Sequence, residues 1–262
     1  MMRRLSFLVD FATYYITAQN RHHIHSDFFY RLTNEVINNN KQEHAFNMLE
    51  NLHSGLKQNN TVIPFTDFGA GRSHSTHKQL TVSAIAKNSA KPARYARLMY
   101  RLVHHFKPQQ ILELGTSLGI TTLYMAAASP ASKIITLEGS NEVANLAEEN
   151  FRKLKCDTIE LVRGPFDETL YKKVQGLNSL DFVFFDGNHQ KKPTLDYFAI
   201  CLSRKTNNSV FVFDDINWST QMKEAWETIK QHPDVYVTID LFMMGLVFFN
   251  PDFSRQHFKL RF

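Results

Sequence analysis

The sequence has little cysteine and no long apolar run. Only two of its 262 residues are cysteine, and Cys156 and Cys201 lack the close spacing of a zinc knuckle or of a disulfide framework. The longest uncharged stretch, residues 114–132, contains two glycines and a proline, which suit a membrane span poorly. Asp10 interrupts the apolar N-terminal run, so no export signal is expected. These absences predict a cytoplasmic protein with no membrane partner.

The charge is close to balanced. Thirty lysines and arginines against 25 acidic residues leave a net charge of +5, and the basic residues form no stripe of the kind that nucleic-acid binders present. A nucleic-acid partner is therefore not expected. With 43% hydrophobic and 21% charged residues, the composition is that of a globular protein.

Short apolar runs alternate with helical patterns from residue 110 onward. The runs predict seven strands: 111–115, 133–138, 159–162, 180–186, 209–215, 235–240 and 245–249. The helical patterns lie at 119–128, 141–154, 167–175, 193–203 and 219–231. Such alternation requires parallel strands joined by right-handed crossovers, and only the last two strands are close enough for an antiparallel hairpin. The fold class is thus α/β, a Rossmann-like doubly wound seven-stranded sheet with an antiparallel last strand.

The first ninety residues follow a different pattern. Amphipathic stretches near 3–18, 28–38, 41–57 and 91–106 predict helices, so residues 1–90 are interpreted as a helical accessory region on a core domain of residues 91–262. The accessory region is expected to close an acceptor pocket with the aromatic residues Phe28, Phe29, Tyr30 and Phe68. His22, His23 and His25 lie too close together to form a closed metal site alone. Residues 257–262 alternate polar and apolar side chains and predict an edge strand.

A strand, a glycine turn and an apolar helix follow one another around residue 115. Gly115 and Gly119 allow the backbone to turn sharply and approach a ligand, while the amides at the helix start offer hydrogen-bond donors. The pattern is not the GxGxxG of dinucleotide folds, because Glu113 would repel a pyrophosphate and attract an ammonium group. This favours a nucleoside ligand with a cationic end, and S-adenosylmethionine has both an α-amino group and a sulfonium.

These residues resemble class I S-adenosylmethionine-dependent methyltransferases, and among them the catechol-type O-methyltransferases and a bacterial group with the same layout. The resemblance covers about residues 91–250 and is carried by the segments 113–119 and 136–140. It implies the same seven-stranded sheet and S-adenosylmethionine as cofactor. The residues of the first segment assigned to the cofactor are Glu113, Gly115, Thr116, Ser117 and Gly119.

Further cofactor contacts are expected beyond the next two strands. Glu138 ends the second strand, where its carboxylate can accept both ribose hydroxyls, with Gly139 and Ser140 on the adenine side. The alternative is a surface acid beside a turn. By the resemblance, Phe166 stacks on the adenine and Asp167 accepts from its exocyclic amine. Without the resemblance, these two residues only form a turn that enters a helix.

Three acids end two adjacent central strands. Asp186, Asp214 and Asp215 would repel one another unless a cation, a proton or an ammonium group separates them. The resemblance implies that they hold Mg²⁺, with Asp215 in place of the family's asparagine, and Asp186 also faces the cofactor. Alternatively the metal has been lost and the acids bind a substrate amine, or Asp214 caps the helix that starts near Ser219.

The general base and the methyl acceptor are the last two parts of the predicted reaction. His189 is the candidate general base beside Asp186, because an imidazole can take up a proton at neutral pH. Lys191 or Lys192 is the alternative that the resemblance offers. Motifs typical of amino-directed and pyrimidine methylation are absent, so O-methylation of a small-molecule hydroxyl is expected. A homodimer is the oligomeric state considered. The alternatives are a non-catalytic cofactor-binding module and an RNA methyltransferase.

Overall fold

The computed structural model describes residues 2–18, 26–67, 76–88 and 92–262. The chain packs into two compact units: unit 1 comprises Met1–Asn38 and Leu177–Phe262, and unit 2 comprises Asn39–Gly176. The predicted boundary between residues 1–90 and 91–262 is a different division of the chain and stays a prediction. Phe68 and the three clustered histidines lie outside the described residues.

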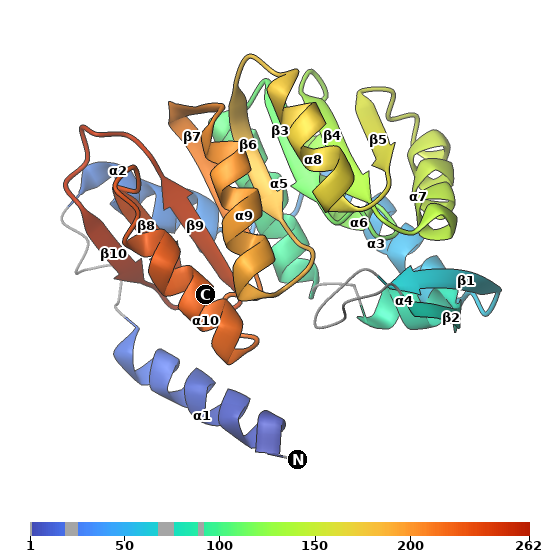
Figure 1. Ribbon diagram of the computed structural model, residues 1–262, viewed down its shortest axis with the longest axis horizontal. Coiled ribbons are helices and arrows are strands. Elements are labelled where there is room, and N and C mark those ends of the chain that lie inside the picture. Colours follow the sequence, from blue (N-terminus) through green and yellow to red (C-terminus); the bar gives the residue numbers. More distant parts are fainter. Residues whose placement is uncertain (1, 19–25, 68–75, 89–91) are drawn as a thin grey trace. The chain divides into compact units, whose positions relative to one another are not determined.

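Unit 2 contains three parallel strands, in the order β3-β4-β5, and a separate antiparallel hairpin of β1 and β2. In Figure 1, α8 lies in front of the three strands, and α5 and α6 lie behind them. The elements are α3 (His44–Gln58), β1 (Val62–Asp67), β2 (Thr76–Thr81), α4 (Val82–Asn88), α5 (Ala93–Phe106), β3 (Gln110–Leu114), α6 (Ile120–Ala128), β4 (Lys133–Glu138), α7 (Asn141–Lys153), β5 (Ile159–Arg163) and α8 (Phe166–Gln175).

Helix α3 is a core element of unit 2. Phe46 and Leu49 of α3 are buried with Tyr124 of α6 and Phe151 of α7 in one hydrophobic cluster. Apolar side chains recur along α3 at the spacing that places them on one face, which explains why the helix forms there. This part of the predicted accessory region therefore packs into the same core as the glycine turn.

Unit 1 contains a mixed arrangement of strands in the order β10-β8-β9-β7-β6. β6 and β7 are parallel, whereas β9 is antiparallel to both β7 and β8. The elements are α1 (Met2–Thr17), α2 (Asp27–Arg31), the π-helix η2 (Leu32–Ile37), β6 (Leu180–Phe185), α9 (Lys191–Leu202), β7 (Lys205–Asp214), α10 (Thr220–Lys230), β8 (Val237–Asp240), β9 (Met244–Phe248) and β10 (Gln256–Lys259).

All seven predicted strands are present, as β3 to β9. The predicted antiparallel hairpin is confirmed, because β8 and β9 pair antiparallel with Asp240 opposite Gly245. The predicted edge strand is β10, which pairs parallel with β8. Among the described helices, none has the length and apolar character needed to cross a membrane.

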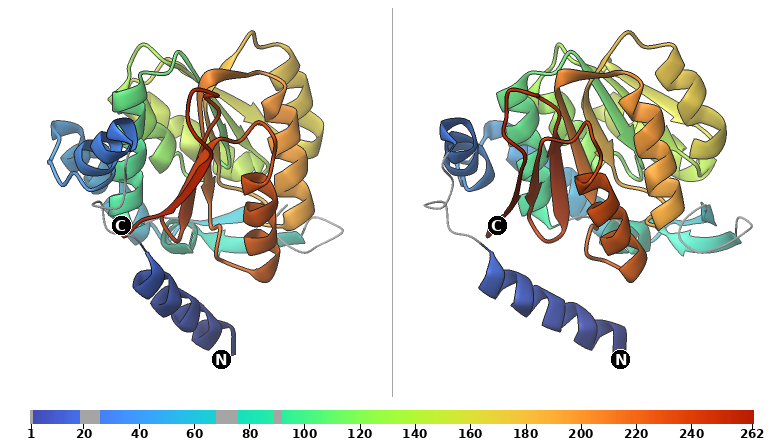
Figure 2. Two further views of the ribbon diagram at one scale, coloured as in Figure 1. Left: turned by 90° about the vertical axis from the view of Figure 1, so that its left-hand side faces the viewer. Right: turned by 60° about the vertical axis from the view of Figure 1, so that its left-hand side comes forward.

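The predicted pocket role of Phe28 and Phe29 in α2 is wrong, whereas Tyr30 is exposed and its role stays a prediction. Phe29 is buried against Phe248, Phe253 and Phe258, and Phe28 stacks on Phe253. Phe248 pairs with Val210, four residues before the carboxyl end of β7, and Figure 2 shows α2 on the face of the unit 1 strands opposite α9 and α10. Because β9 runs antiparallel to β7, Phe248 at the end of β9 lies on the side of the amino end of β7. The rings therefore pack into the core on that side and not at the carboxyl end of β7.

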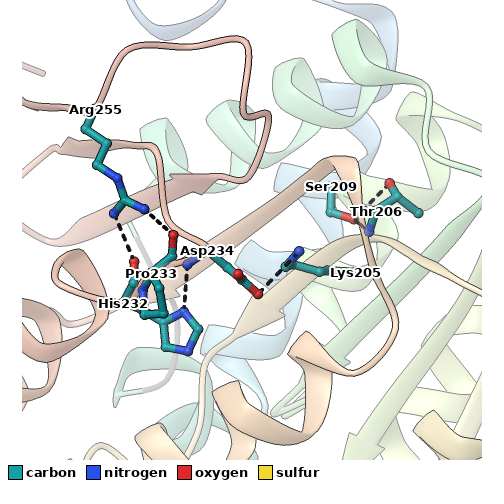
Figure 3. A network of polar contacts seen from close by, with 7 residues as sticks. All are labelled: Lys205, Thr206, Ser209, His232, Pro233, Asp234 and Arg255. Carbon is teal, nitrogen blue, oxygen red and sulfur yellow. Dashed lines mark hydrogen bonds and ion pairs between the residues drawn. The ribbon is translucent and has the colours of Figure 1, made fainter.

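A polar network also lies toward the amino ends of the strands in unit 1 (Figure 3). Arg255 donates hydrogen bonds to three carbonyls after α10, those of His232, Pro233 and Val235. Lys205 at the start of β7 lies 3.4 Å from the Asp234 carboxylate. A guanidinium has donors enough for several carbonyls at a helix C-terminus, where the helix dipole favours positive charge.

Candidate functional site

The glycine turn after β3 has an unusual backbone conformation. Gly115, Ser117 and Gly119 all have positive φ angles, of 106°, 48° and 78°. The amides of Gly115 and Thr116 both donate to the carbonyl of Leu137, at 3.0 and 3.1 Å. The turn therefore doubles back onto the end of β4, which brings it next to Glu138.

Gly119 is the N-cap residue of α6 and makes no side-chain cap. The first amides of a helix have no acceptors within the helix, so a glycine there leaves room for a ligand to accept from them. The turn is held from the other side by Asn150 of α7, whose buried amide donates to the carbonyl of Leu118 at 3.0 Å. The sequence pattern did not reveal Asn150, since a lone asparagine in a helix carries no motif.

Glu138 is held by backbone amides on both sides. Its Oε2 accepts from the amide of Ser117 at 2.8 Å, and its Oε1 accepts from the amide of Ser140 at 2.9 Å. Burial raises the pKa of Glu138, while hydrogen bonds from Ser140, Ser117 and Gly139 act in the opposite direction. A carboxylate offers about four acceptor positions, so acceptor capacity remains beyond the bonds from these amides. The geometry fits a pair of neighbouring hydroxyls.

The loop between β5 and α8 is attached to the same residue. The amide of Gly164 donates to the carbonyl of Glu138 at 2.9 Å, and Glu138 pairs with Arg163 across the strands. Phe166 is the first residue of α8, and Asp167 follows in its first turn. The fold thus brings this loop to Glu138, while the adenine contacts of Phe166 and Asp167 stay predictions.

Glu113 is not the open carboxylate that the sequence predicts. Its side chain has 0% exposure, and its Oε2 accepts from the hydroxyls of Thr136, at 2.6 Å, and Thr122. Thr116 in turn donates to Thr136 at 2.6 Å, because the single proton of Thr136 is directed to Glu113. The carboxylate that the sequence analysis assigned to a cationic ligand is therefore buried, and its Oε2 is bonded to hydroxyls from β4 and α6. Any contact with a bound donor stays a prediction.

Ser140 is also turned inward. It is completely buried at the N-cap of α7, where its hydroxyl donates to Glu142 at 3.3 Å. Its hydroxyl oxygen also accepts from the amide of Thr66 in β1 at 3.4 Å. The backbone amide of Ser140 orients Glu138, whereas its predicted place beside the adenine stays a prediction.

In unit 1, the parallel register of β6 and β7 brings two acids together. Phe185 pairs with Phe213, and their rings stack with centroids 4.2 Å apart. Asp186 and Asp214 follow these two residues directly, so both carboxylates lie at the carboxyl ends of neighbouring strands. Asp214 is only 1% exposed.

His189 completes this cluster. Donor atoms of Asp186, His189 and Asp214 all lie within 4.8 Å of one another. The imidazole Nε2 is 3.8 Å from Asp186 Oδ1 and 3.7 Å from Asp215 Oδ2, so two carboxylates lie near the same ring nitrogen. Asp215 has a positive φ of 55°, and its predicted role as a metal ligand stays a prediction.

The structure bears on two alternatives for this region, of which only the helix cap is decided; the choice of general base stays a prediction. Ser219 caps α10 by accepting from the amide of Met222, so the prediction that Asp214 caps this helix is wrong. Lys191 and Lys192 each form a surface ion pair, with Glu224 at 2.9 Å and Asp196 at 2.6 Å. Their ammonium groups are held along α9 and α10, so His189 is the base candidate that lies within the cluster.

The donor set is suited to a divalent cation. Carboxylate oxygens suit Mg²⁺ or Mn²⁺, and an imidazole nitrogen suits the transition metals. Donor atoms of Asp186, His189 and Asp214 lie close enough together that these residues would hold one divalent ion, which would supply positive charge next to an acceptor oxygen.

Comparisons with known proteins agree with this architecture. A family model described as a methyltransferase domain matches residues 112–216, which include the glycine turn, Glu138 and the acidic cluster. An O-methyltransferase of Aspergillus hancockii is 29% identical over 47% of this chain and 50% of its own length. The catechol O-methyltransferase of Niastella koreensis is 28% identical over 49% of this chain and 57% of its own length.

The solved structures show the fold. The O-methyltransferase TomG of Streptomyces achromogenes, solved in complex with S-adenosylmethionine, superposes with a TM-score of 0.57 at 17% identity, over 80% of this chain and 91% of its own. The fold is therefore the Rossmann-like fold of methyltransferases, with a mostly parallel sheet. The chain spans about half the length of the two curated relatives that it matches.

Proposed function

We propose that the protein is an S-adenosylmethionine-dependent methyltransferase that methylates a hydroxyl oxygen of a small molecule. The observation that carries the proposal is Glu138, whose two oxygens are aligned by the amides of Ser117 and Ser140 at the end of β4. The methyltransferase-domain match supports it, as do the O-methyltransferase names of the relatives. This assignment gives the ribose to Glu138 and the methionine end to the turn of residues 115–119.

The chemistry asks little covalent help from the protein. The sulfonium of the donor is an activated leaving group, so placing the acceptor oxygen in line with the methyl group supplies much of the rate. The attacking hydroxyl must lose its proton, and His189 is the residue proposed to accept it. Asp186 and Asp215 stabilise the imidazolium that forms, because their oxygens lie 3.8 and 3.7 Å from Nε2.

A divalent cation is part of the proposal. Asp186 and Asp214 would hold it, with Asp215 or His189 as a further ligand, and the ion would bind the acceptor oxygens and favour the deprotonated hydroxyl. If His189 binds the ion, it cannot also accept the proton at that nitrogen. Titration with Mg²⁺ and Mn²⁺ therefore decides between the two roles of His189.

The first experiment measures donor binding and metal binding separately. Calorimetry with S-adenosylhomocysteine is expected to show one site per chain, with or without chelator. Asp214→Asn is expected to weaken Mn²⁺ binding about 10- to 100-fold, because a buried ligand charge is lost, and to leave S-adenosylhomocysteine affinity unchanged. Transfer of the methyl group is then measured with a panel of catechols and other phenols.

The control is Asp196→Asn, which makes the same change at an exposed acid paired with Lys192. Absence of S-adenosylhomocysteine binding would end the enzyme proposal. Binding of the donor without transfer to any acceptor would favour a non-catalytic module. Metal affinity that Asp214→Asn leaves intact would remove the acidic cluster as the metal site.

The raised pKa of Glu138 predicts a pH dependence for donor binding. Burial raises the pKa of Glu138 above its value in the unfolded chain. Ionising the buried carboxyl therefore lowers the free energy of unfolding as the pH rises from the ordinary glutamate range through the raised pKa. The ionised form is the one that accepts two ribose hydroxyls. The affinity for S-adenosylhomocysteine should therefore fall on acidification, starting at a higher pH than an ordinary glutamate would allow. A flat profile from pH 8 to 5 would contradict this assignment.

A further inference from the structure

Helix α1 has two apolar faces. Its inner face carries Phe7, Phe11 and Tyr14, whose rings all contact Phe242 with centroids 5.0 to 5.1 Å apart. Phe242 lies in the short turn between β8 and β9, at the carboxyl end of β7. The inner face therefore accounts for the attachment of α1 to unit 1 and leaves the outer face to be explained.

Polar contacts fix the orientation of α1 in unit 1. Lys223 of α10 lies 2.5 Å from the carboxylate of Asp10, and the hydroxyl of Tyr14 donates to the carbonyl of Leu260. The Nε of Arg261 donates to the carbonyl of Tyr15 at 3.2 Å. Contacts in the middle and the C-terminal half of the helix therefore determine which face points outward.

The outer face is apolar. Four of the ten large hydrophobic side chains that are exposed in the described part of the chain lie on this face: Leu8 at 62%, Val9 at 58%, Tyr15 and Ile16 at 78%. Positions 8, 9, 12 and 16 fall on one side of a helix, and position 12 is alanine. In Figures 1 and 2, α1 extends outside the strands of unit 1. A clustered apolar surface of this kind marks an interaction site.

Trp218 is a further exposed aromatic residue beside α1. It is 59% exposed, and its ring lies edge-on to Phe7 with centroids 6.5 Å apart. The amide of Trp218 donates to the carbonyl of Asp215 at 2.9 Å, so the loop that follows the acidic cluster also carries this tryptophan. Tryptophan and tyrosine side chains are enriched at membrane–water interfaces, and Tyr15 of α1 is exposed as well.

The charges around this surface are basic. Arg261 lies over the ring of Tyr15 at 4.4 Å, and the ammonium of Lys259 lies 3.4 Å from the hydroxyl of Thr17. The only acid in α1 is Asp10, and Lys223 neutralises it. A second copy of the chain would bring its own Arg261 and Lys259 to the interface, so positive charges would gather there. An anionic surface would instead complement these basic side chains.

We propose that the outer face of α1, together with Trp218, binds the surface of an anionic lipid bilayer. A helix with aliphatic and aromatic residues on one face and basic residues at its margins lies in the plane of the interface and does not span it. Because Trp218 and Asp215 share a loop, binding would bring the carboxyl end of β7 to the lipid surface. The inference is independent of the proposed methyl transfer, since its test reads only membrane binding.

The test is co-sedimentation with vesicles of phosphatidylcholine containing one third phosphatidylglycerol. The full chain is expected to bind these vesicles, to bind pure phosphatidylcholine at least tenfold more weakly, and to be released by salt. Leu8→Ser combined with Ile16→Ser is expected to reduce binding at least tenfold. Both side chains are exposed, so circular dichroism should show an unchanged fold.

The matched control combines Met48→Ser with Tyr171→Ser, which removes two exposed hydrophobic side chains from α3 and α8 of unit 2. This variant should bind vesicles like the parent protein. The proposal is overturned if the parent does not bind anionic vesicles, if it binds neutral ones equally, or if the α1 variant binds unchanged. Light scattering that shows a dimer dissociated by the α1 substitutions would assign the surface to a second copy.

Discussion

Replacing Glu138 by glutamine should weaken S-adenosylhomocysteine binding about 100-fold. Hydrogen bonds to a charged group contribute about 1.5–3 kcal/mol each, and in the proposed function the ionised carboxylate accepts from two ribose hydroxyls. Glutamine keeps the size of the side chain but turns one acceptor into a donor. That donor would face the amide of Ser117 or Ser140, which both now donate to the carboxylate. Calorimetry measures the loss directly.

The control for this substitution is Glu148→Gln on α7. Glu148 is half-exposed and pairs with Arg163 at 3.2 Å, so the same chemical change removes only a surface ion pair. Its donor affinity should stay within a factor of about two of the parent value, because exposed pairs contribute little. Equal affinities for the two variants would show that Glu138 does not contact the ligand.

Gly119→Ala should destabilise the protein by about 2–5 kcal/mol. A Cβ at this position would lie 2.4 Å from Cε1 of Phe151, well inside van der Waals contact. The φ angle of 78° adds backbone strain for any residue with a side chain. Overpacking and strain of this kind each cost about 1–3 kcal/mol. Urea unfolding, followed by circular dichroism, gives the free-energy difference.

Two further variants separate the causes. Gly55→Ala in α3 meets no atom within 4 Å, so it should stabilise the protein by about 0.5–1 kcal/mol through helix propensity. Introducing Gly119→Ala into a Phe151→Leu background should cost less than in the parent, since the ring is gone while the strain remains. A Gly119→Ala protein as stable as the parent would show that the turn is looser than the structure indicates.

Much of the architecture can be predicted because local patterns carry it. Strands such as Leu180–Phe185 are nearly all apolar, as strands covered on both faces must be. The three residues between Asp240 and Met244 leave room only for a hairpin, which the structure confirms. Gly119 was recognised as a turn residue because only glycine readily adopts a positive φ at a close approach.

The site residues could be named but not oriented. The role of Glu113 depends on Thr136, its partner across β3 and β4, and the sequence does not encode which residues of two parallel strands lie opposite each other. In the same way, the sequence does not show that donor atoms of His189 gather with those of Asp186 and Asp214, because this depends on side-chain directions at one strand edge. The pocket position of Phe28 and Phe29 was predicted wrongly, because a helix with aromatic residues has the same sequence pattern whether it lines a pocket or packs into a core.

The sequence by itself determined the strand order along the chain, the glycine turn and the acids at strand ends, because each depends on neighbours within a few residues. Only the tertiary structure decided which hydroxyls bury Glu113, which amides align Glu138 and which face of α1 remains outside. Those outcomes depend on contacts between segments far apart in the chain, where packing and hydrogen bonding choose among side chains that local patterns leave equivalent.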